Sequence, residues 1–178
     1  MTATILQTFR FPEGTCIAQA EPRSGAPVSR QSPGLSVMTD LTEVRAATVR
    51  PDTSLSQARQ LMIYQGVRLL FVVDKMPCIE GLITSTDLEG DRAIQLVAER
   101  GVRYEELMVS EVMSPLSVLD AIDYDELAGA TVESLIRALL QIGRNHMLVF
   151  QKSTAETPPR IRGVISRAQI ERQLGESL

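Results

Sequence analysis

Apolar residues between positions 47 and 73 alternate between continuous runs and helical spacing. Four of them recur at intervals of three or four, as on a helix that buries one face: Leu55, Ala58, Leu61 and Met62. Three residues before this segment are suitable N-caps: Asp52, Thr53 and Ser54. Gly66 is suited to the C-terminal end of the helix. The pattern predicts a short strand at 47–49, a helix over 55–65 and an apolar strand at 69–73.

Two further elements follow in the sequence. The apolar segment Gly81-Leu82-Ile83 predicts another strand. From Asp87 onward, apolar residues again follow helical spacing as far as Arg100, which predicts a second helix. The segment from 47 to 100 therefore forms one β-α-β-β-α unit.

Three segments of this unit return later in the same order. Val37-Met38-Thr39 returns as Val112-Met113-Ser114, residues 53–73 return as 130–150, and Gly81–Thr84 returns as Gly163–Ser166. Such ordered self-similarity is the signature of an internal structural repeat. The second copy predicts a helix near 132–142, strands near 146–150 and 161–165, and a final helix from about 167.

The repeat predicts an α/β protein of the α+β type, built from two βαββα units. We assign residues 1–36 to an irregular N-terminal arm, 37–110 to the first unit with a connecting helix, and 111–178 to the second. Residues 12–34 are rich in Pro, Gly and Ser, which disfavours regular structure. The preceding Ile5–Phe11 segment fits either an edge strand or a hydrophobic latch. The polar segment 151–160, with Pro158 and Pro159, predicts a hairpin loop.

Composition and charge narrow the class of protein. Hydrophobic residues form 44% of the 178 residues but aromatic ones only 4%, so the core is expected to be aliphatic. The 18 basic residues are scattered among 22 acidic ones, which argues against a nucleic-acid partner. The chain has no apolar run long enough for a membrane span and no signal-peptide pattern at its start. Cys16 and Cys78 are far apart, which fits a reducing cytoplasm.

The sequence carries no recognisable catalytic set. It has neither a Ser-His or Cys-His arrangement, nor a phosphate-binding glycine loop, nor a cluster with metal-ligand spacing. His146 is the only histidine, and a polar or surface role suits it better than catalysis. The acidic run from Asp120 to Glu126 lacks the pattern of a calcium loop, and we expect a solvated loop there. We therefore expect a protein that is not an enzyme and requires no cofactor.

The ordered residues of the first copy resemble the cystathionine-β-synthase (CBS) motif. They are Val49, Pro51-Asp52, Gly66-Val67-Arg68, Val72-Val73-Asp74 and Gly81-Leu82-Ile83-Thr84 with Asp87. The likeness covers residues 49–87 closely, and a more diverged second motif extends it over 37–174. The resemblance implies two motifs packed sheet to sheet about a pseudo-twofold axis, a so-called Bateman module. It also implies a regulatory role, clefts that hold AMP, ADP, ATP or S-adenosylmethionine, and pairing into dimers.

The resemblance further implies ligand-contacting residues. Thr84 would contact phosphate and Asp87 would hold the ribose hydroxyls, although both residues also fit a purely structural role as helix caps. The second copy keeps Ser166 but has Gln169 in place of the aspartate, and so loses a charged bidentate acceptor. Arg68 fits a phosphate contact as well as a salt bridge, and Asn145 and His146 match it in the second copy. The expected ligand-binding residues are Thr48, Val49, Arg68, Thr84, Asp87, His146, Ser166 and Gln169.

These features support a sensor that binds an adenine nucleotide or related adenosyl ligand between its motifs and signals to an effector protein. The alternative is a structural dimerisation module with empty clefts that scaffolds a partner. Thr84 and Asp87 favour the first reading, whereas Gln169 favours the second. We expect about one nucleotide per chain, held by the first copy. The helix near 132–142 is apolar around most of its circumference, which predicts a homodimer through that helix.

Overall fold

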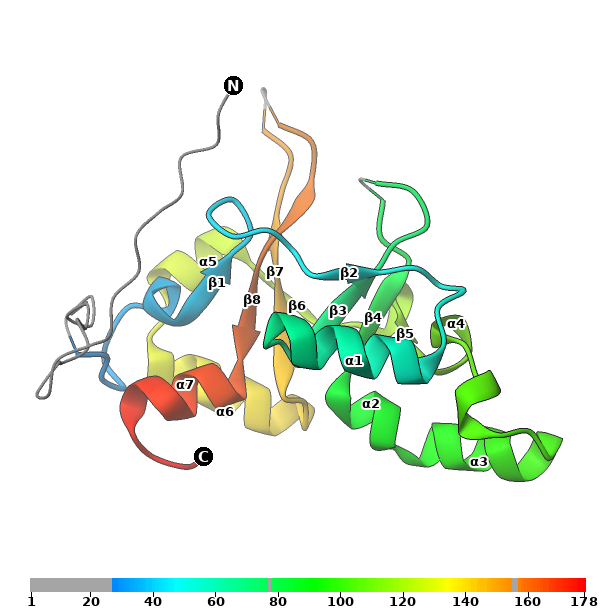
Figure 1. Cartoon of the computed structure of the whole chain (residues 1–178). Helices are drawn as coiled ribbons and strands as arrows, with labels where there is room; N and C mark the ends of the chain where they lie inside the picture. Colours follow the sequence, from blue (N-terminus) through cyan, green and yellow to red (C-terminus); the bar gives the residue numbers. More distant parts are fainter. Residues whose placement is uncertain (1–26, 77, 155–156) are drawn as a thin grey trace, which may run out of the picture.

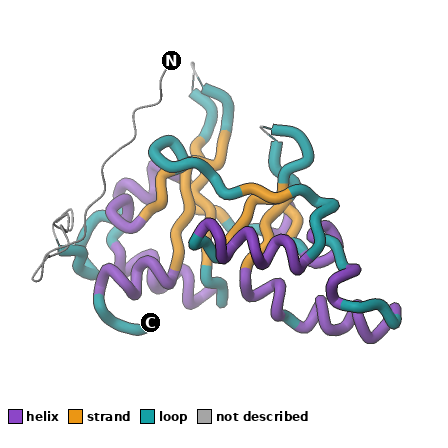
Figure 2. Tube along the Cα trace, viewed as in Figure 1, coloured by secondary structure: helices purple, strands orange, loops and turns teal. Residues whose placement is uncertain are grey.

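The structure is a computed structural model that describes residues 27–178 except 77 and 155–156 (Figure 1). Two four-stranded sheets form its centre, with helices on their outer sides (Figures 1 and 2). The expected mixed α/β fold is confirmed. Most of the expected irregular arm, including the Ile5–Phe11 segment, lies outside the described residues. No helix of the described segments combines the length and apolarity needed to cross a membrane.

The first sheet has the strand order β2-β3-β4-β5. Its strands are β2 (Thr48–Val49), β3 (Leu69–Val72), β4 (Gly81–Thr84) and β5 (Ser114–Pro115). Its helices are α1 (Leu55–Gln65), α2 (Ser85–Glu89), α3 (Asp91–Arg100) and α4 (Val109–Val112). A short 3-10 turn, η2 (Tyr104–Glu106), joins α3 to α4.

The second sheet has the order β1-β8-β7-β6. Its strands are β1 (Met38–Asp40), β6 (Ala121–Asp123), β7 (His146–Gln151) and β8 (Arg160–Ser166). Its helices are α5 (Tyr124–Gly129), α6 (Val132–Ile142) and α7 (Arg167–Leu174), with 3-10 turns η1 (Gly34–Val37) and η3 (Leu116–Val118). β7 and β8 form the expected hairpin around residues 151–160.

The predicted helix over 55–65 is confirmed as α1. Ser54 is its N-cap and forms a capping box with Gln57, which satisfies backbone N–H groups of the first turn. Gly66 ends the helix with φ 66°, a left-handed conformation that glycine adopts without strain. The predicted helix over 132–142 is confirmed as α6, with Thr131 as its N-cap and Gly143 at its end.

Two local expectations were wrong. The helix expected from Asp87 to Arg100 is broken into α2 and α3 by Gly90, whose backbone is extended at φ −81° and ψ 168°. The acidic run, expected as a solvated loop, contains strand β6 and helix α5. There Asp123 accepts a hydrogen bond from the backbone N–H of Asp125 and so caps the helix.

The two units exchange their outer strands. β1, at the start of the first copy, pairs antiparallel with β8 in the second sheet, with Asp40 opposite Gly163. β5, at the start of the second copy, pairs antiparallel with β4 in the first sheet, with Pro115 opposite Gly81. The segment that the sequence repeat places at the head of each copy therefore completes the sheet of the other copy.

The matching glycines Gly81 and Gly163 make room for the exchanged strands. A Cβ atom at Gly81 would lie 2.2 Å from the backbone oxygen of Ser114. A Cβ atom at Gly163 would lie 2.6 Å from the sulfur of Met38 and 2.8 Å from the backbone oxygen of Thr39. The glycine in each copy of the repeat is thus required by close backbone approach.

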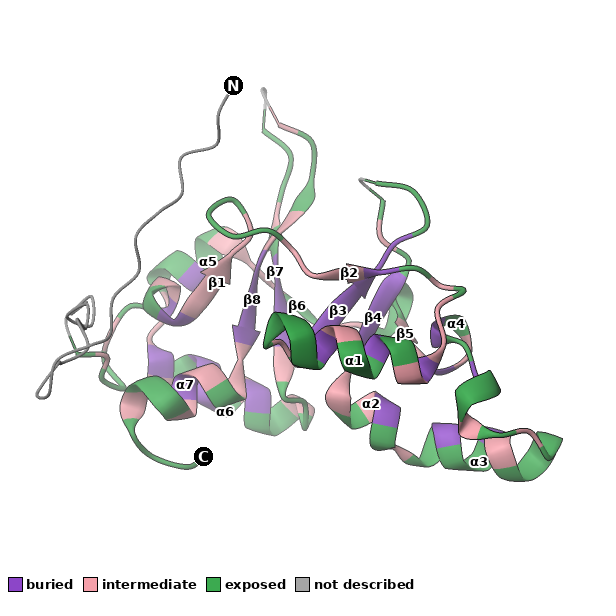
Figure 3. Ribbon diagram, in the orientation of Figure 1, coloured by how far each residue is buried: buried purple, intermediate pink, exposed green. Residues whose placement is uncertain are grey.

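An apolar layer joins the two sheets face to face. Its buried residues come from both sheets: Leu69, Phe71, Val73, Leu82, Leu148 and Val164. Each unit also has a core of its own between its sheet and its helices (Figure 3). The cores are mainly aliphatic, as the composition predicts.

An ion pair fixes the exchanged strand β1. Arg162 on β8 donates two hydrogen bonds to the carboxylate of Asp40, at 2.9 and 2.7 Å. Thr42 donates two more to the same carboxylate, and the guanidinium lies 5.2 Å from the centre of the Tyr124 ring. The bond from Arg162 is the main reason why the pKa of Asp40 lies well below its usual range.

We predict that Gly81→Ala lowers the free energy of unfolding by about 2 kcal/mol or more, because β5 must move away from β4. Chemical denaturation measures this change. Gly129→Ala is the matched control, because a Cβ atom there meets nothing within 4 Å and alanine favours a helix. Equal effects of the two substitutions would contradict this role for Gly81.

We predict that Asp40→Asn lowers the free energy of unfolding at pH 7 by about 1–3 kcal/mol, since hydrogen bonds to a charged group are lost. The folded-state pKa of Asp40 is depressed, so its contribution is full above the unfolded pKa of about 4 and fades as the pH falls below it. Denaturation at several pH values should show parent and variant converging in acid. Asp52→Asn, which disrupts an exposed pair with Arg50, should have little effect.

Candidate functional site

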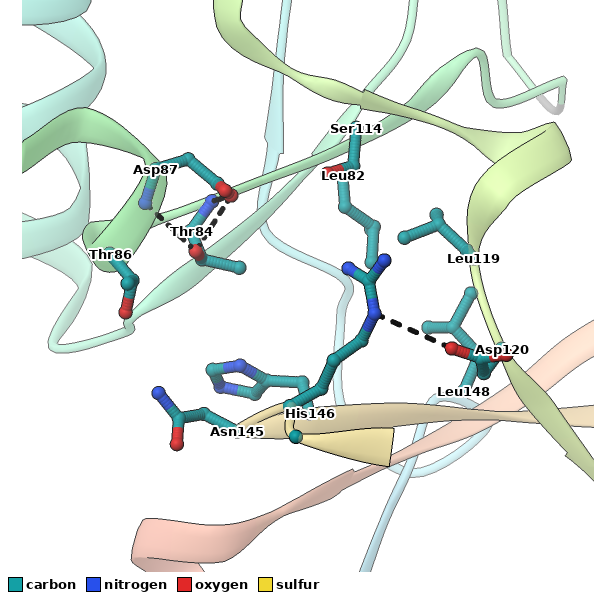
Figure 4. Close-up of a pocket in the computed structure, with 12 residues that line it drawn as sticks. Leu82, Thr84, Thr86, Asp87, Ser114, Leu119, Asp120, Asn145, His146 and Leu148 are labelled. Atoms are coloured by element: carbon teal, nitrogen blue, oxygen red, sulfur yellow. Dashed lines mark hydrogen bonds and ion pairs between the residues drawn. The ribbon is translucent and has the colours of Figure 1, made fainter. Parts of the chain in front are cut away.

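Two clefts lie between the units, and the first is formed around the end of β4. It has a volume of about 180 Å³. Thr84, Thr86 and Asp87 lie on one side, and Asn145 and His146, at the start of β7, lie on the other (Figure 4). The rest of its lining is Leu82, Ser114, Leu119, Asp120, Gly143, Arg144 and Leu148.

Thr84 and Asp87 form a capping box at the start of α2. The backbone N–H and the hydroxyl of Thr84 donate to Oδ2 of Asp87, at 2.8 and 2.7 Å. The backbone N–H of Asp87 donates in turn to the Thr84 hydroxyl, at 3.2 Å. Thr84 and Asp87 therefore do cap helix α2. Oδ1 of Asp87 has no hydrogen-bond partner among the described residues, so the carboxylate keeps an acceptor that can face a ligand.

A second carboxylate and an arginine border the first cleft. Nε of Arg144 lies 3.4 Å from Oδ2 of Asp120, and both side chains are about half exposed. The charge of Arg144 is therefore balanced by Asp120. With Asp87 included, the first cleft has two carboxylates and one cation, so it does not attract a highly charged anion.

His146 lines both clefts. Burial lowers the pKa of its imidazole, and Arg68 lowers it further, while Asp87 acts in the opposite direction. The ring is therefore neutral at pH 7, with one nitrogen as a donor and the other as an acceptor. It supplies hydrogen-bonding capacity without adding a fixed charge.

The second cleft lies around the end of β8 and is larger, at about 570 Å³. It contains Ser166 and Gln169, the counterparts of Thr84 and Asp87. Gln169 accepts a hydrogen bond from the Thr39 hydroxyl at 2.9 Å, whereas Ser166 makes no side-chain cap at the start of α7. The Ser-x-x-Gln segment thus does not reproduce the closed capping box of the first cleft.

Each cleft combines parts of both units. Thr84 and Asp87 face Asn145 and His146, whereas Ser166 and Gln169 share their cleft with Arg68. Arg68, expected near the phosphate of a ligand held by the first copy, therefore lines the other cleft. Arg68 directly precedes β3, whose first residue Leu69 pairs with Thr84, and it shares the second cleft with Gln169 of α7.

Thr48 and Val49 line neither cleft. They border an open depression together with Arg50 and Met76. Ala46 and Ala47, just upstream, line the second cleft instead. β2 begins only at Thr48 and pairs in parallel with Phe71 and Val72, so the residues that reach the cleft precede the strand.

Sequence reasoning missed several lining residues. Arg45 and Arg172 line the second cleft, and Asp120 and Arg144 form the ion pair of the first. Arg144 directly precedes Asn145, so the alignment of the two copies could have drawn attention to it. Arg45 and Arg172 lie in no repeated motif, and only the fold brings them together.

A comparison with known protein families gives a match over part of the first unit. The family model described as the CBS domain matches residues 36–89. No curated protein matches the chain.

Solved structures resemble the whole fold. An uncharacterized conserved protein from Pyrococcus horikoshii has 20% identity and a TM-score of 0.59, over 85% of this chain and 98% of that one. The CBS-domain containing protein ATU1752 from Agrobacterium tumefaciens has 21% identity and a TM-score of 0.54, over 75% and 88%. CBSX2 from Arabidopsis thaliana, solved in complex with AMP, has 20% identity and a TM-score of 0.52, over 79% and 93%. At these identities the likeness establishes the fold.

Proposed function

Because the chain carries a CBS domain and folds as a tandem CBS pair, we propose that it is a non-catalytic regulatory module for an adenine nucleotide or related adenosyl ligand. In this proposal the ligand binds in the first cleft, with its ribose at Asp87. The AMP complex of CBSX2 supports an adenosyl ligand by analogy of fold. The candidate ligands are AMP, ADP, ATP and S-adenosylmethionine.

The observation that carries the proposal is that Oδ1 of Asp87 accepts no hydrogen bond from the described residues. A carboxylate oxygen can accept hydrogen bonds from both hydroxyls of a ribose diol, and such charge-assisted bonds are stronger than neutral ones. The capping box holds the carboxylate in place without using this oxygen. The same contacts that cap α2 therefore orient Asp87 toward a ligand, and the structural and functional roles are compatible.

Size and charge restrict the ligand. Small-molecule pockets usually measure about 300–1,000 Å³, so a cleft of about 180 Å³ must widen to admit an adenosyl group. The half-exposed Arg144–Asp120 pair is the part that can yield at low cost, since exposed ion pairs contribute little stability. The two carboxylates favour S-adenosylmethionine or AMP over ATP.

Widening the cleft would move the two units relative to each other, and an effector protein could recognise that change.

The exposed Cys78, with no disulfide among the described residues, suits a reducing cytoplasm, where we place the protein. The competing function is a structural dimerisation module with empty clefts. Its support is the closed Thr84–Asp87 capping box, which satisfies much of the polar chemistry of the site internally.

We predict that Asp87→Asn weakens binding of AMP or S-adenosylmethionine at least tenfold, because the charged acceptor is lost while a side-chain oxygen remains to cap α2. Asp87→Ala should abolish measurable binding. Gln169→Ala should leave binding nearly unchanged, since that residue lies in the other cleft. Calorimetry on the purified variants measures this, with thermal unfolding as a check of folding. Equal loss in the Asp87 and Gln169 variants, or no binding by the parent, would contradict the proposal.

We also propose a homodimer through its helices. Helix α6, the predicted contact, buries Val132, Leu135, Ile136 and Leu139 in its own unit and leaves Leu140 54% exposed. On α1, by contrast, Ile63 and Tyr64 are 73% and 89% exposed. Such adjoining large apolar side chains are typical of contact surfaces, so we propose that α1 contributes to the dimer contact together with α6.

We predict that the parent protein sediments as a dimer at micromolar concentration. Replacing Ile63 and Tyr64 by serine should raise its dissociation constant at least tenfold, since tyrosine is enriched among the few residues that carry most of the binding energy at interfaces. Met76→Ser is the control, because Met76 is also exposed but lies outside α1. A monomeric parent in sedimentation would exclude the dimer, and an equal effect of Met76→Ser would exclude this interface.

A further inference from the structure

The chain contains a single histidine, and it stands at the border of the apolar layer between the two sheets. His146 begins β7 and pairs with Ser166 of β8, just as Leu69 begins β3 and pairs with Thr84 of β4. Leu69 is buried in the apolar layer, and alternate residues of a strand share a face, so His146 follows Leu148 of the same layer. An ionisable ring therefore takes the place that an aliphatic side chain fills in the other unit.

The imidazole lies between groups of opposite charge. It is half-buried and lines both clefts, which it shares with Asp87 on one side and with Arg68 on the other. It makes no hydrogen bond with any described residue. The other charged residues that line the two clefts are Asp120, Arg144, Arg45 and Arg172. Arg167, which follows the paired Ser166, is engaged with Glu171. Burial and the field of these charges therefore decide whether the ring binds a proton.

We propose that His146 is a proton-operated switch in the contact between the two units. The neutral ring extends the apolar layer, whereas a protonated ring places a positive charge at the end of this layer and opposite Arg68, so the contact between the sheets loosens. Asp87 offsets that charge only in part, because Thr84 already donates two hydrogen bonds to its Oδ2. The ligand of this switch is a proton, so the inference goes beyond the proposed function and does not depend on an adenosyl ligand.

The pH range of the switch follows from the environment of the ring. Burial holds the pKa of His146 below its ordinary value of about 6.5, while Asp87 raises the pKa and Arg68 lowers it. Because the pKa is lower in the folded chain, the unfolded chain binds the proton first as the pH falls. The contribution of the neutral ring to stability is therefore full above about pH 6.5 and is lost as the pH falls below that value.

Proton NMR on protein prepared without a histidine tag tests the position of the ring, since one histidine gives one set of imidazole signals. The midpoint of their titration should lie below about pH 6.5 in the parent. Arg68→Gln should raise the midpoint and Asp87→Asn should lower it. Arg137→Gln on α6, which removes a charge outside both clefts, should leave it unchanged. A midpoint at or above pH 6.5, or one that neither cleft variant moves, would overturn the inference.

Thermal unfolding at pH 7.5 and 5.5 tests the switch itself. On acidification the melting temperature of the parent should fall by about 2–4 °C more than that of His146→Leu, in which leucine matches Leu69. His146→Asn, polar but unable to titrate in this range, should show the same pH dependence as the leucine variant. In the parent, the amide NMR signals of Leu148 and Val164 should follow the midpoint of the imidazole. Equal pH dependence of the parent and both variants would refute the switch. Both measurements are made without nucleotide, so their outcome is separate from that of the adenosyl site.

Discussion

The apolar contact between the inner faces of the two sheets determines the arrangement of everything else in the molecule. Leu69, Phe71 and Leu82 of one sheet meet Leu148 and Val164 of the other, and water is excluded between them. Both clefts open at the border of this contact. At the equivalent border position, Leu69 begins β3 and His146 begins β7. The apolar layer therefore ends in a leucine on one side and in a polar ring on the other.

The two clefts share one backbone plan but differ in chemistry. Thr84 corresponds to Ser166 and Asp87 to Gln169, at the same place after equivalent strands. In the first cleft a carboxylate is held ready and the nearby arginine is neutralised by Asp120. In the second cleft glutamine takes the place of the aspartate, and Arg45, Arg68 and Arg172 make no ion pair or hydrogen bond with any described residue. A few side-chain differences on a duplicated scaffold thus give the two clefts of one chain different chemistry.

Local signals in the sequence were enough to predict much of the fold. α1 and α6 combine apolar periodicity with an N-cap and a terminal glycine, so pattern and capping agree. β6 could not be predicted, because it is three residues long and acidic at its end, and its position depends on parallel pairing with β7. The clefts were only partly predictable. The repeat assigns residues to a copy, whereas each cleft takes side chains from both copies, and Arg45 and Arg172 carry no local pattern at all.

The exchange of outer strands affects how the protein can form during synthesis. β5 follows the other strands of the first sheet, so that sheet can be completed as soon as residue 115 has emerged. β1 is made before either sheet, yet its partner β8 is nearly the last element, and Asp40 must wait for Arg162, 122 residues later. Until then β1 and its surroundings lack their partner, a state in which unpaired strands favour association with other chains. A truncated chain that lacks β8 would leave β1 without its partner permanently, so this early strand depends on an element that is synthesised more than a hundred residues later.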